Sequence, residues 1–237
     1  MVILMYDLYQ SSYEIIDEII NEMPSCSKDD GDYEFKIFSY IYARLSSMLV
    51  YDDYASEVAS LSLGGFDRER AYDSIVYPAS DLRVLCRGKA LCGGFAKALS
   101  VTLEKVGIKS VEVKAEGKHV WNQVYLDGKW YNCDLTNDYD FVNAGLNCRY
   151  FLKSNADCPN FKKYDVISEY KECDESISDE KQEELLTEAV SYVNELKRKK
   201  EAEELAVMEV EEKHVPKFIR VIMSIFKKEK KNGGSIK

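Results

Sequence analysis

The chain has 237 residues, an ordinary apolar content and few Pro or Gly, so most of it should fold around one sizeable core with an appendage. Its formal net charge of -10 argues against nucleic acid as a partner, because phosphate binding needs a basic surface. The charge is uneven: residues 213–237 hold eight Lys or Arg and one Glu, and the rest of the chain is acidic.

The chain holds seven cysteines without a CxxC pair, and an odd number argues against a disulfide framework. The N-terminal residues show no basic segment, apolar stretch and cleavage site in the order of a secretory leader. No apolar run approaches the length of a bilayer span. We therefore expect a cytoplasmic protein whose thiols are reduced.

Helical spacing of apolar residues predicts helices over residues 12–22 and 33–49, followed by a weakly patterned region. A further helix is predicted after Gly93 and Gly94, since Phe95, Leu99 and Leu103 recur at helical spacing before Gly107 ends the pattern. This places Cys92 at or just before a helix N-terminus.

The pattern then changes to alternation rich in Val, Tyr and Trp, which predicts strands at 111–115, 119–126 and 130–136. Asp127 and Gly128 form a strong hairpin signal, and in a two-residue hairpin the paired residue numbers would sum to about 255. Residues 149–153, RYFLK, read as another strand. After Asp174 a charged helix continues until Pro216.

Cys92, His119 and Asp134 are the candidate catalytic residues. A cysteine nucleophile must be a thiolate, and the free N–H groups and dipole of a helix N-terminus favour that anion at Cys92. Of the two histidines, only His119 lies in the patterned core, so it is the candidate base. Asp134, on the far strand of the hairpin, would orient the imidazole if the register slipped slightly.

Four further residues are candidates for substrate contacts. Gly93 and Gly94 would let a substrate backbone approach closely. Trp121 is either a core aromatic or a shield of the Cys-His pair against water, and Asn122 either bonds substrate or faces solvent.

The motifs LCGGFAKAL, HVWNQVYLDGKWYNCDLT and RYFLKS resemble the core of transglutaminase-like proteins, over roughly residues 33–165. The resemblance implies an α+β, papain-like fold in which a nucleophile helix packs on an antiparallel sheet, with a Cys-His-Asp triad at Cys92, His119 and Asp134. It implies acyl transfer from a peptide or carboxamide of a protein substrate, with water or an amine as acceptor. No calcium site is evident in the sequence, so we expect a mechanism without a metal or another cofactor. The chain departs from the pattern at Asn137, where members often carry Trp, and in FKKYD, where many bacterial members carry a His.

The predicted organisation is a transglutaminase-like catalytic domain over residues 1–170, a charged helical extension over 171–214 and a basic amphipathic tail over 215–237. Residues 215–231 could lie on an anionic membrane or an acidic partner. The blander interpretation, which we favour, is that the tail packs on the acidic body or is partly unordered.

Two other interpretations remain at this point. Cys92, His119, Cys133 and Asp134 are ligand types suited to a metal, although their spacing lacks the short pairs of structural zinc sites. The same fold could also serve as a peptide-binding or adaptor module without activity.

Overall fold

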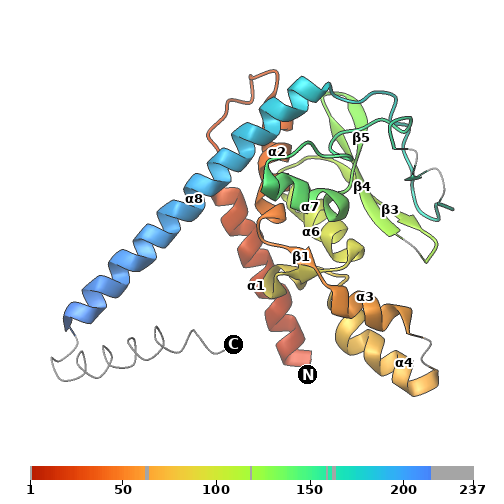
Figure 1. Cartoon of the computed structure of the whole chain (residues 1–237), viewed down its shortest axis with the longest axis horizontal. Coiled ribbons are helices and arrows are strands. Elements are labelled where there is room, and N and C mark those ends of the chain that lie inside the picture. Colours follow the sequence, from red (N-terminus) through yellow and green to blue (C-terminus); the bar gives the residue numbers. More distant parts are fainter. Residues whose placement is uncertain (1, 62–63, 118, 159, 162–163, 215–237) are drawn as a thin grey trace, which may run out of the picture. The chain divides into compact units, whose positions relative to one another are not determined.

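The computed structural model describes residues 2–61, 64–117, 119–158, 160–161 and 164–214. The chain divides into two compact units, Met1–Val193 and Asn194–Lys237. The first unit has a mixed α+β fold, and Figure 1 shows its helices and strands. The described helices are α1 (Val2–Asn21), α2 (Tyr33–Ser46), α3 (Asp53–Ser60), α4 (Gly65–Ala71), the π-helical turn η1 (Tyr72–Val76), α5 (Val84–Arg87), α6 (Cys92–Lys105), α7 (Leu135–Ala144) and α8 (Asp179–His214).

Three strands form an antiparallel sheet in the order β3-β4-β5: β3 (Ser110–Ala115), β4 (His119–Leu126) and β5 (Lys129–Cys133). The β4–β5 pairs run from Leu126 and Lys129 to Asn122 and Cys133, so the predicted hairpin register is confirmed. Asp127 and Gly128 both have positive φ, 46° and 80°, as a two-residue turn of type I′ requires.

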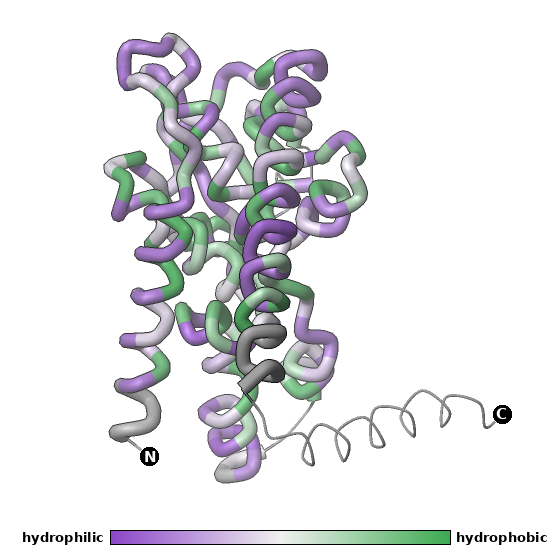
Figure 2. The backbone as a smooth tube through the Cα atoms, turned by 90° about the vertical axis from the view of Figure 1, so that its left-hand side faces the viewer, coloured by the Kyte–Doolittle hydropathy of each residue, from purple (hydrophilic) through white to green (hydrophobic). Residues whose placement is uncertain are grey.

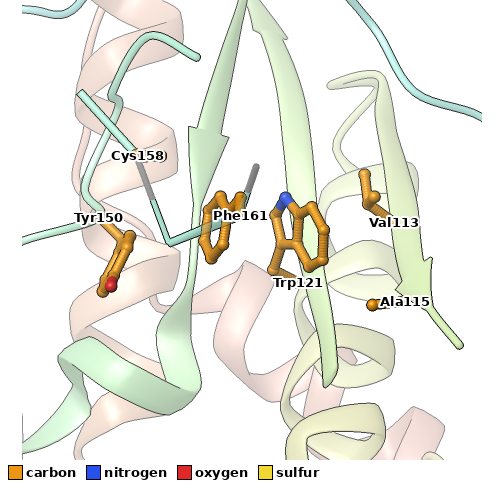
Figure 3. Packing of buried hydrophobic residues seen from close by; sticks show 6 residues of the cluster. All are labelled: Val113, Ala115, Trp121, Tyr150, Cys158 and Phe161. Carbon is orange, nitrogen blue, oxygen red and sulfur yellow. The ribbon is translucent and has the colours of Figure 1, made fainter. Parts of the chain in front are cut away.

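Strand β4 separates two layers of the core, because successive side chains point to opposite faces. Asn122 faces α6, where its amide donates to Ala96 O and Ser100 Oγ. Trp121 faces the other way, and Figure 3 shows Phe161 lying between Tyr150 and Trp121. The rings of Phe161 and Trp121 stack at 4.3 Å between centroids, and those of Phe161 and Tyr150 at 4.9 Å.

Helix α6 forms the layer behind the sheet and contacts β3, β4, α2 and α7. Its residues Phe95, Leu99 and Leu103 are fully buried, as the helical spacing predicts. The start of α6 lies against the chain between η1 and α5, where Leu91 N donates to Ala79 O at 2.6 Å. A Cβ on Gly94 would stand 2.6 Å from both Ala79 O and Val84 Cγ1, so only glycine fits there.

The weakly patterned region forms short helices that the sequence did not predict, together with a parallel pair of strands, β1 (Val50–Tyr51) and β2 (Lys89–Ala90). Buried residues of α3, η1 and the segment before α6 make a small core of their own: Ala55, Val58, Val76, Ala79 and Leu91. The elements there are too short for an apolar period to show in the sequence.

Two strand predictions are wrong. Residues 149–153 form one isolated bridge, between Lys153 and Asn132, because Leu152 has φ of 53° and the chain cannot stay extended through it. The strand predicted over 130–136 ends at Cys133, because Asp134 begins α7 as its N-cap.

The first turns of α8 belong to the first unit, where Leu185, Leu186, Ala189 and Val193 are buried. The compact unit therefore extends beyond the predicted boundary at residue 170. Figure 2 colours the backbone by hydropathy and shows both hydrophilic and hydrophobic residues along the long helix that leads to the C-terminal segment. The predicted tail, 215–237, lies outside the described residues, and none of the described helices is long and apolar enough to cross a membrane.

The buried carboxyl of Asp138, in α7, connects this helix to α2 and to the backbone at Arg149 and Tyr150. It accepts a hydrogen bond from Tyr42 Oη of α2 at 2.9 Å and from the backbone N–H groups of Arg149 and Tyr150. Burial, opposed by these donors and reinforced by the charge of Asp134, raises the pKa of Asp138 to about 7.

Gly94→Ala should destabilise the protein, although Gly to Ala within a helix normally stabilises it. The added methyl meets a backbone oxygen that cannot move aside, and overpacking of this kind costs about 1–3 kcal/mol. Urea unfolding measures the change, and Gly31→Ala, where a Cβ meets nothing within 4 Å, is the control. Equal stability of the two variants would contradict the packing argument.

Asp138→Asn should change how stability depends on pH. Because the folded pKa of about 7 exceeds the ordinary 3.8, the native state holds the extra proton between these values, and the free energy of unfolding falls as pH rises through that window. The variant lacks this slope, so its stability relative to the unsubstituted protein should rise by roughly 2–3 kcal/mol from pH 5 to pH 8. A pH-independent difference in urea unfolding would rule this out.

Candidate active site

Cys92 is the first residue of α6, and Leu91 before it has extended backbone. The first N–H groups of a helix have no partner within it, so they are free to bind an anion. Here the backbone N–H groups of Gly93 and Val120 act on the Cys92 sulfur and help to lower its pKa, and the thiol is half-buried. Helix α6 therefore presents a partly accessible sulfur beside the start of β4.

His119 is the first residue of β4, and its side chain lies beside the Cys92 thiol, where each group shifts the pKa of the other. Its Nε2 lies 2.6 Å from Asp134 Oδ2, so Nδ1 is the ring nitrogen left for the sulfur. The side chain is 13% exposed, whereas that of Asp134 is 0% exposed. The three groups thus form a series that runs from the half-buried thiol through the imidazole to a buried carboxylate.

Asp134 reaches His119 without any slip in register. Residues on one face of paired strands alternate, and Asp134 continues the face of β5 that carries Asn132, which bonds Trp121 of β4. His119 and Asp134 are therefore diagonal neighbours on this face, within reach of each other's side chains. Asp134 also caps α7, since its Oδ1 accepts from the N–H of Asn137 at 3.3 Å.

The three groups change one another's protonation. Burial raises the pKa of Cys92, but the hydrogen bond and charge of His119 and the two backbone N–H groups outweigh it, so the pKa is lowered from 9.0. Burial lowers the pKa of His119, but Asp134 and Cys92 outweigh it and raise the pKa to about 10. Both directions favour a thiolate beside an imidazolium at neutral pH.

The lowered pKa distinguishes Cys92 from five other thiols of the chain. Burial raises the pKa of each of them, to about 12 for Cys158 and Cys173 and well above 9.0 for Cys133 and Cys148, with a smaller rise at Cys26. These cysteines behave as small apolar residues, and the activated thiol is the one beside the imidazole.

An aromatic wall stands beside the imidazole. Trp121 is 1% exposed and lies nearly parallel to the His119 ring, with 6.1 Å between centroids. The rings of Phe161 and Tyr164 lie 6.5 and 6.1 Å from His119. These rings lie beside the imidazole, and Trp121 Nε1 donates to Asn132 Oδ1. The shielding role of Trp121 stays a prediction.

Two of the predicted substrate contacts need correction. Asn122 is 1% exposed and its amide is bonded to α6, because strand alternation turns it away from His119. Gly94 is also buried, and its lack of a side chain serves the packing of α6 on Ala79 and Val84. Gly93 is half-buried beside Ser80, and its backbone N–H helps to lower the pKa of Cys92.

Asn137 is the site residue that the sequence did not predict as one. Its side-chain Nδ2 donates to Asp134 Oδ2 at 2.5 Å and lies 3.5 Å from His119 Nε2. The signal was present, because an Asp followed three residues later by a polar side chain is typical of a helix N-terminus.

The metal-site interpretation has no geometric support. Cys133 turns away from the series, with its thiol donating to Asn122 O. Within the described ranges, no group of three or more His, Cys, Asp or Glu side chains is arranged to hold a metal ion.

No family model and no curated protein matches the chain. Among solved structures it is similar to one described as "Crystal structure of a TGase", at 24% sequence identity and a TM-score of 0.36. The similarity covers 54% of this chain and 32% of that chain, so the chain spans less than half of the other protein's length. A similarity this distant adds nothing to the geometry of the site.

His119→Ala should raise the pKa of Cys92, because burial would then be opposed by the two backbone N–H groups without the imidazole. At pH 7 we expect alkylation of Cys92 by iodoacetamide to slow at least about tenfold, the effect of one pKa unit on the thiolate population. Peptide mass spectrometry across a pH series measures the rate, with His214→Ala, the other histidine, as control. Superimposable pH profiles for His119→Ala and the unsubstituted protein would exclude an activated pair.

Proposed function

We propose that the chain is an enzyme that transfers acyl groups through a cysteine thioester, in the manner of transglutaminase-like proteins. Cys92 is its nucleophile, His119 its general acid and base, and Asp134 the group that orients the histidine. The substrate class is a peptide or carboxamide carbonyl of a protein or peptide.

One observation carries the proposal: the half-buried thiol of Cys92 lies close enough to His119 for each to shift the pKa of the other, and Nε2 of His119 lies 2.6 Å from the buried carboxylate of Asp134. A cysteine with a purely structural role does not require an imidazole beside it, and a histidine with a purely structural role does not require a thiolate. The lowered pKa of Cys92 gives this arrangement a chemical consequence, a thiol that ionises more readily than an ordinary cysteine.

In the first half of the proposed reaction, the Cys92 sulfur attacks the carbonyl carbon and forms a C–S bond. The carbonyl electron pair moves to oxygen, and the resulting oxyanion accepts a hydrogen bond from the backbone N–H of Cys92 at the α6 N-terminus. The C–N bond then breaks, and the leaving nitrogen takes the proton of the His119 imidazolium. The products are an amine or ammonia and a thioester on Cys92.

In the second half, His119, now neutral, accepts a proton from the acceptor as its oxygen or nitrogen attacks the thioester carbon. The C–S bond breaks and the sulfur leaves as a thiolate, which restores the ion pair. Water gives a carboxylic acid, and a primary amine gives a new amide. We take water as the acceptor, because it is abundant and none of the described site residues selects an amine.

The papain-like arrangement is part of the same proposal. Its support is the relation of the elements: α6 carries the nucleophile and packs on the antiparallel sheet whose strand β4 carries the base. Asp134 follows β5 directly, so base and acid lie at the ends of two neighbouring strands, and α6 presents the thiol beside the base.

Cys92→Ala and Cys92→Ser should both abolish ammonia release from glutamine-containing peptides, with a loss of at least about a thousandfold in rate. The unsubstituted protein should also show a mass increase on the Cys92 peptide after rapid quenching in acid, which preserves the thioester. Adding a primary amine separates transfer, which yields an amide, from hydrolysis, which yields a carboxylate.

Cys86→Ala is the matched control, because the thiol of Cys86 is half-buried like that of Cys92. Its ammonia release and its iodoacetamide labelling should equal those of the unsubstituted protein. The proposal fails if both Cys92 variants keep the rapid labelling at neutral pH, since the reactive thiol would then be elsewhere.

A further inference from the structure

Asn137 is bonded to Asp134 in an unusual way for a residue in the first turn of a helix. Its backbone N–H donates to Asp134 Oδ1 at 3.3 Å, as helix capping requires, and its side-chain Nδ2 donates to Asp134 Oδ2 at 2.5 Å. In a capping box, the side chain at this position bonds the backbone N–H of the capping residue instead. In this protein the side-chain amide of Asn137 bonds the carboxylate of Asp134 itself.

The polarity of these contacts is fixed by the short bond to His119. Because His119 Nε2 lies 2.6 Å from Asp134 Oδ2, the ring proton must lie between them. Nδ2 of Asn137 is also a donor, so its 3.5 Å approach to His119 Nε2 is a contact between two donors that share one acceptor. Oδ2 of Asp134 thus receives the imidazole and the amide together, and Oδ1 receives the helix N–H.

Exposure separates the two side chains. Asp134 is 0% exposed, whereas Asn137 is exposed, so the amide lies on the solvent side of the carboxylate. A water molecule that replaced the amide would bond Oδ2 without holding the carboxylate plane, and it would compete with His119 for the same oxygen. The covalent link of the amide to α7 removes that freedom.

We propose that Asn137 is a positioning residue: it fixes the Asp134 carboxylate against His119 Nε2 and keeps water from that bond. That this serves catalysis rests on the function proposed above. The contact between Asn137 and Asp134 does not depend on that function, so it can be tested without the reaction.

The test uses proton NMR of the imidazole in a Cys92→Ala background, where the thiol plays no part. The chain has two histidines, so the His119 signals are readily assigned by removing His214. We expect the Nε2–H of His119 to be protected from exchange with water, and Asn137→Ala to speed that exchange by about tenfold or more. Asn137→Gln, which keeps the donor, should restore part of the protection.

Thr136→Ala is the control, because it alters the same turn of α7 and leaves the amide in place. Thermal unfolding of each variant shows whether the fold is retained. An exchange rate in Asn137→Ala within about twofold of its parent overturns the positioning role, as does equal acceleration in Thr136→Ala, which would show loosening of the helix.

A second measurement links the role to the thiol. With Cys92 present, Asn137→Ala should shift the pH profile of Cys92 alkylation upward by about one pH unit, and Thr136→Ala should not. An ordinary thiol titration in the unsubstituted protein would overturn the proposed function while the imidazole exchange still decides the role of Asn137. Faster imidazole exchange with an unshifted alkylation profile would refute the link between Asn137 and catalysis.

Discussion

The site depends on one buried charge, the carboxylate of Asp134. A carboxylate with no exposed surface is costly unless donors surround it, and here the donors are the first turn of α7 and the imidazole of His119. The same group therefore starts a helix and orients the proposed base. The position of the imidazole is tied in this way to the backbone of α7, which packs on α2 and α6 in the core.

The charge at Asp134 also determines which thiol is reactive. It helps to raise the pKa of His119 to about 10, and the imidazolium in turn lowers the pKa of Cys92 against the effect of burial. Burial acts without this opposition at Cys133, whose sequence neighbour is Asp134 itself, and there the negative charge raises the pKa further. The reactivity of a thiol in this protein therefore depends on its surroundings and not on the residue type alone.

The sequence predicts those features of the site that depend on local turn, strand and helix patterns. The Asp127-Gly128 turn sets the register of β4 and β5, and the helix that starts at Cys92 follows from Gly93 and the apolar spacing. The directions in which individual side chains point were harder to predict from the sequence. Asn122 points into the α6 layer because of strand alternation, and the chain bends at Leu152 because of one positive φ that no apolar pattern encodes.

The strand predicted to run through Asp134 ends one residue before it, and that early end builds the site. Pairing of β4 with β5 stops at Asn122 and Cys133, so the first residues of β4 have an open edge on that side. The N–H of Val120 in this stretch helps to lower the pKa of the Cys92 thiol, while the side chain of His119 contacts Asp134 on one face of the sheet. Had β5 continued, its backbone would have run along the edge that the thiol now occupies. The turn of Asp134 into α7 thus both supplies the acid and leaves the edge free for the nucleophile.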